Sequence, residues 1–504
     1  MSRWVGLPTV TLDDLDDIET LRRAAKMLES ENLQMAKMIT RLKRELFELK
    51  HGKAKQLELQ LQIQELEEQL ARRNKMLFGE KSEKRAAKKS KTEEPKKQTG
   101  HGRREHPQLE QVEQLHVANV DDAQCDLCGG SLSAEENFFE ESEEIDIVER
   151  KFVLKKHRRQ KYKCECGSCI KTAPGPLKLF DGARYSVGFA LHVTMGKYAD
   201  HLPLERQVKG MKRDGLTVDS QTLWDQINIL AKHLEPAYER LQGYVLSQAV
   251  IGVDETHWKL MGEKGKKNGG KGKHWQAWAI VCPDAVHYSF EDSRSAETAR
   301  SVLGDYAGIV LTDGYAAYSS VKKRGGSFKL AHCWAHVRRK FVEVEEQHPG
   351  KCAEVLDLIG RLYEIEREAK EKPPDELLEM RRKRSKPIIV AIQNWALGAE
   401  ALPESNLGRA IKYMSGLWDG LRLFLDDPHL PLDNNATERA LRGVVLGRKN
   451  HYGSRSERGT RVAAILYSLI ESAKLAGVGP HTYLHTAINA ALRGNPIPLP
   501  HETA

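Results

Sequence analysis

A carboxylate inside an apolar segment is the feature that most constrains this chain. Five of the six residues at 248–253 are small or apolar, and the run then meets Asp254. Beyond it, Thr256, Trp258 and Leu260 alternate with polar residues, which is the period of a half-buried strand. An acid in such a strand is costly to desolvate unless a cation, a hydrogen-bond network or a metal compensates it. The segment therefore predicts either a hydrogen-bonded aspartate at a strand bend or one ligand of a metal site.

The order of elements after Asp254 gives it a neighbour. Strands are expected at 248–260, 274–281, 286–290, 308–312 and 328–332, with helices at 296–303 and from 333 onward. Three antiparallel strands, then a helix, a strand, a helix and a strand, is the order of a ribonuclease-H-like fold. In that fold the centre of the first strand lies beside the end of the fourth, which Asp313 follows. Two adjacent carboxylates repel each other, and a shared divalent cation relieves the repulsion.

A long helical segment separates this core from a third acidic residue. Residues 345–430 are amphipathic and predict an inserted helical domain. Glu438 then falls in the first turns of a helix that Asp433 or Asn434 can cap. Arg442 shares its face at i+4, so the spacing alone indicates an ordinary surface ion pair. The basic residues that follow are suited to phosphates. They are Arg448, Lys449, Arg455, Arg458 and Arg461.

Clustered cysteines predict a structural zinc site. The candidate ligands are Cys125, Cys128, Cys164, Cys166 and Cys169. Two such groups suit a tetrahedral zinc held by four thiolates, which leaves no open position for catalysis. Only four of the five are needed: Cys166 with Cys169 has the standard spacing, so Cys164 is the candidate spare. Alternating residues between the two groups predict strands at 144–148 and 151–154.

Assembly and DNA-binding elements are expected before the core. Residues 20–78 carry a heptad pattern with Asn32 at an a position, which favours a parallel dimer, although a helical hairpin fits as well. Between Lys81 and Arg104, ten Lys or Arg stand against three Glu, so this stretch is a solvated tether or a phosphate contact. Residues 181–246 look helical, with a turn at 214–217 that fits a helix-turn-helix or a bundle that binds no DNA.

Composition narrows the class of protein. The net charge of +8 favours a polyanionic partner. No run of about 18 apolar residues predicts a membrane span, and no secretory signal is recognisable at residues 1–10. Clustered cysteines in a chain of this kind indicate metal binding in a reducing cytoplasm.

Several motifs together resemble one known family. They are VDET at 253–256, TDGY at 312–315, CWAHVRRKF at 333–341, DNNATERALR at 433–442, GRKN at 447–450, YSLIESAKLAGV at 467–478 and KYADHLPLERQ at 197–207. The chain resembles the DDE transposases of the insertion-sequence-sixty-six family over nearly its whole length. The resemblance implies that Asp254, Asp313 and Glu438 are the catalytic triad. One departure concerns zinc: the family's second group is usually Cys-x2-Cys directly after Tyr-x, whereas Tyr162-x-Cys164 is followed here by two further cysteines.

The resemblance also implies a mechanism and partners. Two Mg²⁺ or Mn²⁺ ions about 3.5–4 Å apart would activate the nucleophile and stabilise the leaving oxygen. Water would free a 3′-hydroxyl at the element end, and that hydroxyl would attack target DNA without a covalent enzyme intermediate. Double-stranded DNA, a second copy of the chain and accessory proteins of the same element are the expected partners, at the nucleoid in a bacterial cytoplasm. Two alternatives are an inactive DNA-binding regulator and a plain nuclease.

Further residues are assigned roles on the same basis. His332, His336 and Arg338 are candidates for positioning the site or contacting phosphate, although they also suit the start of a helix. The expected DNA contacts are Arg338, Arg339, Arg439, Arg442, Arg448, Lys449, Arg455 and Arg458.

The sequence thus predicts a multidomain α+β protein built around a ribonuclease-H-like core of mixed sheet and helices. The expected parts are a coiled coil at 1–78, a basic linker at 79–118, a zinc-binding module at 119–180, a helical DNA-binding domain at 181–246, the first part of the core at 247–344, the helical insertion at 345–430, the second part of the core at 431–478 and a tail at 479–504.

Overall fold

A computed structural model describes residues 34–42, 63, 66–67, 151–163, 170–261 and 273–503. Backbone contacts separate a unit of residues 75–151 from a unit that holds the remaining residues. The predicted basic linker, all five zinc-ligand candidates and most of the heptad segment lie outside the described residues. Within the heptad segment, residues 34–42 are helical, and Ile39 and Ile63 are buried. Dimerisation through a coiled coil stays a prediction.

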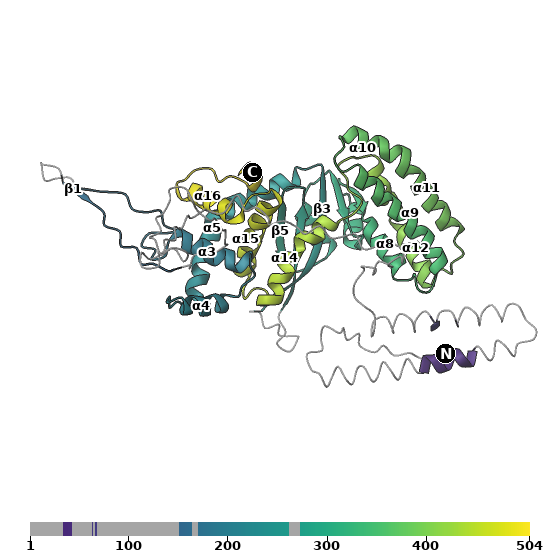
Figure 1. The fold of residues 1–504 in the computed structure, drawn as a ribbon, viewed down its shortest axis with the longest axis horizontal. Helices are drawn as coiled ribbons and strands as arrows, with labels where there is room; N and C mark the ends of the chain where they lie inside the picture. The colour runs from purple at the N-terminus through teal and green to yellow at the C-terminus, as the bar shows by residue number, and fades with distance from the viewer. Residues whose placement is uncertain are drawn as a thin grey trace, which may run out of the picture. The chain divides into compact units, whose positions relative to one another are not determined.

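A five-stranded mixed sheet forms the centre of the larger unit (Figure 1). Its strands are β3 (Val250–Leu260), β4 (Lys273–Val281), β5 (Val286–Glu291), β6 (Ile309–Thr312) and β7 (Lys329–His332), in the order β5-β4-β3-β6-β7. The first three are antiparallel neighbours, while β6 runs parallel to both β3 and β7. All five predicted strands are therefore confirmed. The mixed α+β class is confirmed as well, with an order consistent with the expected ribonuclease-H-like core.

Helices cover both faces of this sheet. The connections are α6 (Ala296–Leu303), α7 (Ala316–Lys323) and α8 (Trp334–Val342), followed late in the chain by α14 (Asn435–His451) and α15 (Glu457–Leu475). Helix α14 packs along β3 and β4, and α15 packs on β5. The segment that carries Glu438 therefore returns to the centre of the sheet, although more than a hundred residues separate it from β6.

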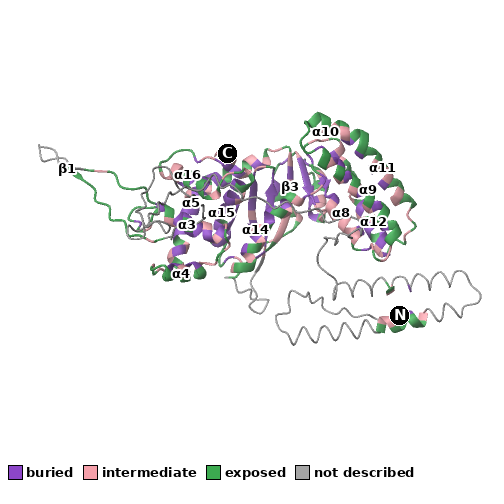
Figure 2. Ribbon diagram, in the orientation of Figure 1, coloured by how far each residue is buried: buried purple, intermediate pink, exposed green. Residues whose placement is uncertain are grey.

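The helices before the sheet share its core. They are α3 (Val187–Tyr198), α4 (Leu204–Arg213) and α5 (Ser220–Leu246), and they pack with α16 (Pro480–Leu492), which precedes η5 (Pro500–Thr503). The Asp219 side chain caps α5 by accepting a 2.6 Å hydrogen bond from Thr222 N. Leu223, Ile227 and Leu230 of α5 are fully buried in the same core as the sheet. Figure 2 colours the buried parts of the sheet and of the helices packed on it purple. The second helix of the predicted helix-turn-helix is thus a core helix on one face, and its role in DNA binding stays a prediction.

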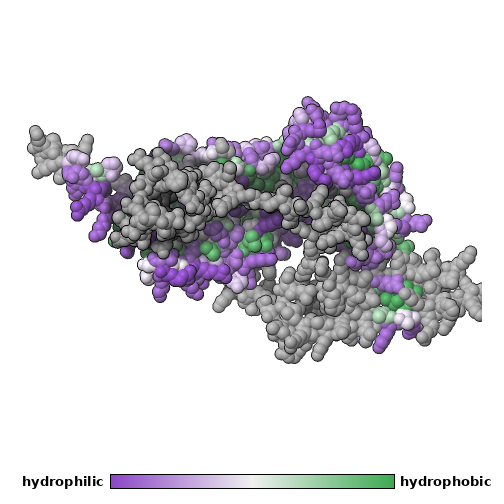
Figure 3. Space-filling view, in the orientation of Figure 1, coloured by the Kyte–Doolittle hydropathy of each residue, from purple (hydrophilic) through white to green (hydrophobic). Residues whose placement is uncertain are grey.

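The insertion packs into a second hydrophobic core, which it shares with β6, β7 and α8. Its elements are α9 (Pro349–Glu368), α10 (Pro374–Met380), η3 (Arg381–Ser385), α11 (Lys386–Gly398), α12 (Asn406–Gly416), α13 (Trp418–Arg422) and η4 (Leu423–Leu425). Ile359, Leu362 and Ile365 of α9 are buried as the sequence predicts, while Leu356 is partly exposed. Figure 3 shows hydrophilic side chains over α10 and α11, which face solvent. The helices that the sequence predicts in this segment are present, and its assignment as an inserted domain stays a prediction.

Arg381 joins the insertion to the segment that leads to Glu438. Only 1% of its side chain is exposed, and its guanidinium forms a two-pronged ion pair with Glu366 at 2.6 and 2.8 Å. It also donates to the carbonyls of Phe424, Asp427 and Leu430 at 2.7–3.1 Å. The planar guanidinium can satisfy all these acceptors at once. The return path of the insertion is therefore held by one buried cation.

A short hairpin brackets the second cysteine group. Strand β1 (Lys161–Lys163) pairs antiparallel with β2 (Ile170–Thr172). The strand predicted at 151–154 is wrong, because these residues pair with no other strand. The Phe152 ring instead packs edge-on against Phe189 of α3, with ring centroids 6.3 Å apart. Of the helices described, none is both long and apolar enough to cross a membrane.

Candidate active site

Strand register places Asp254 and Asp313 side by side. Val250 pairs with Ile309 and Gly252 with Leu311. The pairing ends there, and Asp254 and Asp313 each lie two residues beyond the last pair, at the same end of the two strands. Each carboxylate accepts one backbone hydrogen bond of 2.8 Å, from Glu255 N and Tyr315 N respectively. This is the neighbourhood that the strand order predicts.

The start of α14 brings Glu438 to the same place. Asn434, which is 1% exposed, donates from Nδ2 to the Val253 carbonyl at 3.2 Å. The hydroxyl of Thr437 donates to Asn434 Oδ1 at 2.5 Å, and Asn434 N donates to Cys333 Sγ at 3.2 Å. These bonds fix the first turn of the helix against β3, one residue before Asp254. Glu438 follows Thr437 directly.

Gly252 makes this contact possible. A Cβ at this position would overlap Thr437 Oγ1 and would come within 2.6 Å of Asn434 Oδ1. Glycine weakens a strand, so its presence in a strand interior often marks the close approach of another backbone. The sequence contains this signal, and we did not predict the contact from it.

Burial and negative neighbours act together on Asp254. Burial is the largest influence that raises the pKa of Asp254 from 3.8 to about 7. The charges of Asp313, Glu255 and Glu438 raise it further, and the hydrogen bond from Glu255 N opposes them. The three predicted catalytic carboxylates are thus near enough for their charges to interact.

The oxygen atoms of these three carboxylates are suitable ligands for a hard divalent cation. Asp254, Asp313 and Glu438 would supply oxygen ligands only, which Mg²⁺ prefers. The Oε1 atom of Glu438 is buried and accepts no hydrogen bond. Across the described ranges, however, no three His, Cys, Asp or Glu side chains are arranged to enclose a single ion. The carboxylates converge, and their oxygens would have to close around a bound cation.

Two histidines stand at the edge of these carboxylates. His336 of α8 lies 3.4 Å from Glu438, from Nε2 to Oε1, which is the separation of an ion pair without hydrogen-bond geometry. His332 ends β7 beside Thr312 and is buried, so desolvation lowers its pKa to about 4 although the charge of Asp313 opposes this. Two of the three predicted candidates, His332 and His336, therefore lie near these carboxylates. Glu438 forms its ion pair with His336 and not with Arg442.

A second network beside Asp254 escaped sequence reasoning. The Glu255 side chain is 3% exposed and pairs with Arg294 at 2.6 Å. Tyr318 donates to the same carboxylate at 2.8 Å, and the Arg294 guanidinium lies 4.1 Å from the centre of the Tyr315 ring. Tyr315 also donates its hydroxyl to the Arg294 carbonyl. The loop after β6 and the strand β3 are therefore linked on the face opposite α14.

The insertion contacts the Asp313 turn. Tyr413 of α12 donates its hydroxyl to the Asp313 carbonyl at 2.6 Å. Gly314 has a φ of +96°, and a Cβ there would come within 2.8 Å of Leu417. Only glycine adopts this backbone conformation readily, so the turn depends on it.

The predicted DNA contacts fall into two groups. Arg439, Arg442, Lys449, Arg455 and Arg458 are exposed, while Arg338 and Arg339 of α8 are half-buried. Arg448 is also half-buried and donates to the His257 carbonyl. Arg461, which the sequence grouped with them, pairs with Glu235 at 2.8 Å and Glu239 at 3.4 Å on α5. Arg461 therefore joins two helices of the core.

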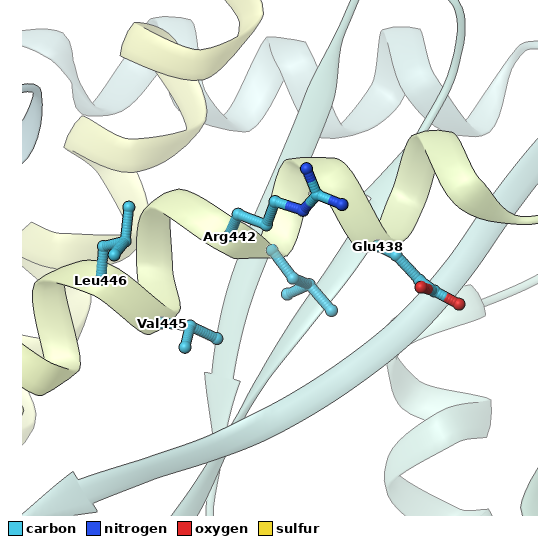
Figure 4. Close-up of a pocket in the computed structure, with 5 residues that line it drawn as sticks. Glu438, Arg442, Val445 and Leu446 are labelled. Carbon is cyan, nitrogen blue, oxygen red and sulfur yellow. The ribbon is translucent and has the colours of Figure 1, made fainter. Parts of the chain in front are cut away.

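The exposed face of α14 carries an apolar hollow beside Glu438. Leu441, Val445 and Leu446 line it together with Glu438 and Arg442. Figure 4 shows the Glu438 carboxylate pointing away from the Arg442 guanidinium. Arg442 is thus available to a ligand on this face.

Comparison with known proteins identifies the family. Residues 182–462, more than half of the chain, match the model of the family described as Transposase IS66 family. The chain belongs to the IS66 family of transposases. Residues 122–167 match a second model, the zinc-finger binding domain of transposase IS66. The family is one of DDE transposases, which are phosphoryl-transfer enzymes, so the predicted family is confirmed.

Three relatives come from Sinorhizobium fredii. Uncharacterized protein y4jD is 32% identical over 386 residues, which cover 74% of this chain and 75% of that protein. Uncharacterized protein y4hP is 27% identical, over 75% of this chain and 72% of its own length. Uncharacterized protein y4qI is 29% identical, over 70% and 68%.

The contact at Gly252 gives a first prediction. Gly252→Ala should push the start of α14 away from β3 and lower the free energy of unfolding by about 1–3 kcal/mol, as overpacking does. DNA cleavage should fall with it because Glu438 moves. Urea denaturation and a cleavage assay measure the two effects. Gly360→Ala in α9, where a Cβ meets nothing within 4 Å, is the control, and a Gly252→Ala variant as stable and active as wild type would contradict the contact.

The raised pKa of Asp254 gives a second prediction. Between about pH 4 and pH 7 the folded protein keeps a proton that the unfolded chain has released, so stability falls as pH rises. A shift from 3.8 to about 7 corresponds to at most roughly 4 kcal/mol. Asp254→Asn should therefore raise the free energy of unfolding in EDTA at about pH 8 and lose this gain toward about pH 4. Urea denaturation across this range tests it, with the exposed Asp305→Asn as control. If Asp254→Asn and wild type were equally stable at the higher pH, the buried charge of Asp254 would carry no cost, and the prediction would be wrong.

Proposed function

We propose that this IS66 family transposase binds the ends of its insertion sequence and catalyses metal-dependent strand cleavage and strand transfer. The observation that carries the proposal is the convergence of Asp254, Asp313 and Glu438; burial is the main cause of the raised pKa of Asp254, and the charges of the other two add to it. Family membership supports the reaction class. The ribonuclease-H-like assignment of the core rests on its strand order.

Each carboxylate has a distinct structural support in this proposal. Asp254 and Asp313 project from adjacent parallel strands, and Glu438 comes from the first turn of a docked helix. Together they would hold two Mg²⁺ or Mn²⁺ ions. Such ions, when bound, activate an attacking oxygen and stabilise a leaving oxygen in phosphoryl transfer. His336 would keep the Glu438 carboxylate oriented while the site is open.

Basic side chains near Glu438 would position the DNA. Arg439 and Arg442 are exposed on the same helix, one and four residues beyond Glu438. Phosphate contacts fix the register of a protein on a duplex. Lys449, Arg455 and Arg458 would extend this contact beyond the helix, with Arg338, Arg339 and Arg448 nearer the sheet.

The modules outside the described residues belong to the same proposal. Four of Cys125, Cys128, Cys164, Cys166 and Cys169 would bind a structural zinc. The match to the zinc-finger domain supports this, and it ends at residue 167, before Cys169. A coiled coil at 1–78 would make the protein at least a dimer, and residues 181–246 would contribute to DNA binding. The domain limits proposed from the sequence stand with these assignments.

Two other functions make different predictions. A DNA-binding regulator would bind without cleaving, and the three converging carboxylates argue against it. A plain nuclease would cleave without joining ends to a target. The large insertion, which contacts the Asp313 turn and the approach to Glu438, argues against that.

Loss of a single carboxylate tests the proposed catalysis. Asp254→Asn, Asp313→Asn and Glu438→Gln should each abolish cleavage of element-end DNA in Mg²⁺, because each removes a charged ligand, while DNA binding survives. Asp305→Asn should cleave normally. A labelled-end strand-transfer assay with wild type would separate transposase from nuclease. Cleavage by Asp254→Asn at near the wild-type rate would refute the assignment of Asp254 as a catalytic residue.

Zinc content tests the cysteine module. Elemental analysis of the full chain should give one zinc per chain, and alanine at Cys125 or Cys128 should remove it. Because the site is structural, the loss should weaken specific end binding more than it lowers the rate of cleavage at saturating DNA. Alanine at Cys164, Cys166 and Cys169 in turn would identify the unused cysteine. Zinc-free wild-type protein would refute the module.

A further inference from the structure

Helix α4 carries a row of unpaired basic residues. Arg206, Lys209 and Arg213 are spaced at i, i+3 and i+7, so they share one face of the helix. All three are exposed, and none forms an ion pair with another residue in the described part of the chain. Figure 3 shows hydrophilic side chains where α4 lies in Figure 1.

Several basic residues elsewhere in the described part of the chain pair with acidic neighbours. Arg384 pairs with Glu368, and Lys383 pairs with Glu379. Arg461 bridges two glutamates on α5. On α4 the acidic residues, Glu205 at its start and Asp214 just after its end, pair with none of the three cations. The row on α4 therefore leaves its positive charge available to a partner.

The same face is hollowed. Three cations, Arg206, Lys209 and Arg213, and one carboxylate, Asp214, line a depression of about 450 Å³. Its other lining residues are His192, Leu202, Gln207, Gly210 and Met211. Gly210 lowers the stability of the helix, because glycine in a helix interior is less favourable than alanine by about 1 kcal/mol. A Cβ there would meet only the far end of Arg213, at 3.9 Å. The missing side chain thus serves no internal packing, and it lets a ligand approach the helix backbone closely.

The helix is held rigidly in place. Gln207 is 8% exposed, and its Nε2 donates to the carbonyls of Val193 and Leu202 at 3.3 Å. The turn between α3 and α4 also touches the helix that carries Glu438, because a Cβ on Gly443 would lie 3.8 Å from His201. Gly443 follows Arg442 directly in the sequence. A duplex held along α14 would therefore have α4 close by.

From these observations we infer that the face of α4 formed by Arg206, Lys209, Gly210 and Arg213 binds the DNA phosphate backbone. The row of basic residues, the depression that they line and the missing side chain at Gly210 together allow phosphates to approach the helix closely. Because the row is positively charged, its charge is complementary to a polyanion. The inference rests on the proposed function in that it takes DNA as the substrate. It adds a phosphate-binding surface formed by α4, outside the catalytic carboxylates.

Salt dependence of binding tests this surface. Duplex DNA of arbitrary sequence is the probe, because backbone contacts do not depend on sequence. Removing one phosphate-binding cation should reduce the slope of log K against log salt concentration by about 0.9. Glutamine at Arg206, Lys209 and Arg213 together should therefore lower the slope by roughly 3. Lys212→Gln, an exposed cation of the same helix outside the hollow, should leave it unchanged.

Gly210→Ala separates binding from folding. Alanine favours the helix, so the thermal midpoint should stay or rise, while DNA affinity should fall because the methyl group occupies the approach to the backbone. An unchanged slope in the triple variant with normal wild-type binding would overturn the α4 surface and leave the proposed function intact. Failure of wild type to bind or cleave DNA would instead overturn the proposed function.

Discussion

The structure of the site depends on one contact between a helix and a strand. The side chains of Asn434 and Thr437 lie directly against Gly252 and the Val253 carbonyl, because Gly252 has no side chain of its own. This contact crosses more than 180 residues of sequence, as the separation of Asn434 from Val253 shows. Because Glu438 is the next residue after Thr437, its position relative to Asp254 follows from the packing of the Asn434 and Thr437 side chains against the backbone of β3. Such packing admits little adjustment, since protein interiors are close-packed.

The insertion supports the same geometry from the other side. Arg381 holds the carbonyls of Phe424, Asp427 and Leu430 just before the chain enters α14. Tyr413 of the same insertion donates to the Asp313 carbonyl. One helical domain therefore contacts the approaches to two of the three carboxylates. An insertion at this point of the fold has a structural reason, because the two segments it holds carry Asp313 and Glu438.

The strand order and the pairing of Asp254 with Asp313 could be predicted from sequence because both depend on local patterns. Alternation defines the strands, and the order of elements then decides which strands are neighbours. Glu438 could not be placed this way, since a long insertion removes any argument from spacing, and its placement needed the family resemblance. The strand expected at 151–154 shows where a local pattern fails, because the segment is not a strand. Its alternation was genuine, but Phe152 found its partner on α3, and local pattern cannot foresee that contact.

Charge compensation distinguishes the catalytic candidates without reference to any family. Four carboxylates meet at Asp254, and burial makes each additional negative charge more costly. The chain supplies a permanent cation to one of them, because Arg294 pairs with Glu255 at 2.6 Å. Asp254 and Asp313 instead accept neutral backbone N–H groups, and Glu438 lies beside His336, which is charged only when protonated. These three carboxylates thus have no permanently charged side-chain partner, and a bound metal ion would supply one. They are also the side chains that the transposase assignment needs as metal ligands, so the electrostatics of this chain and its family membership agree.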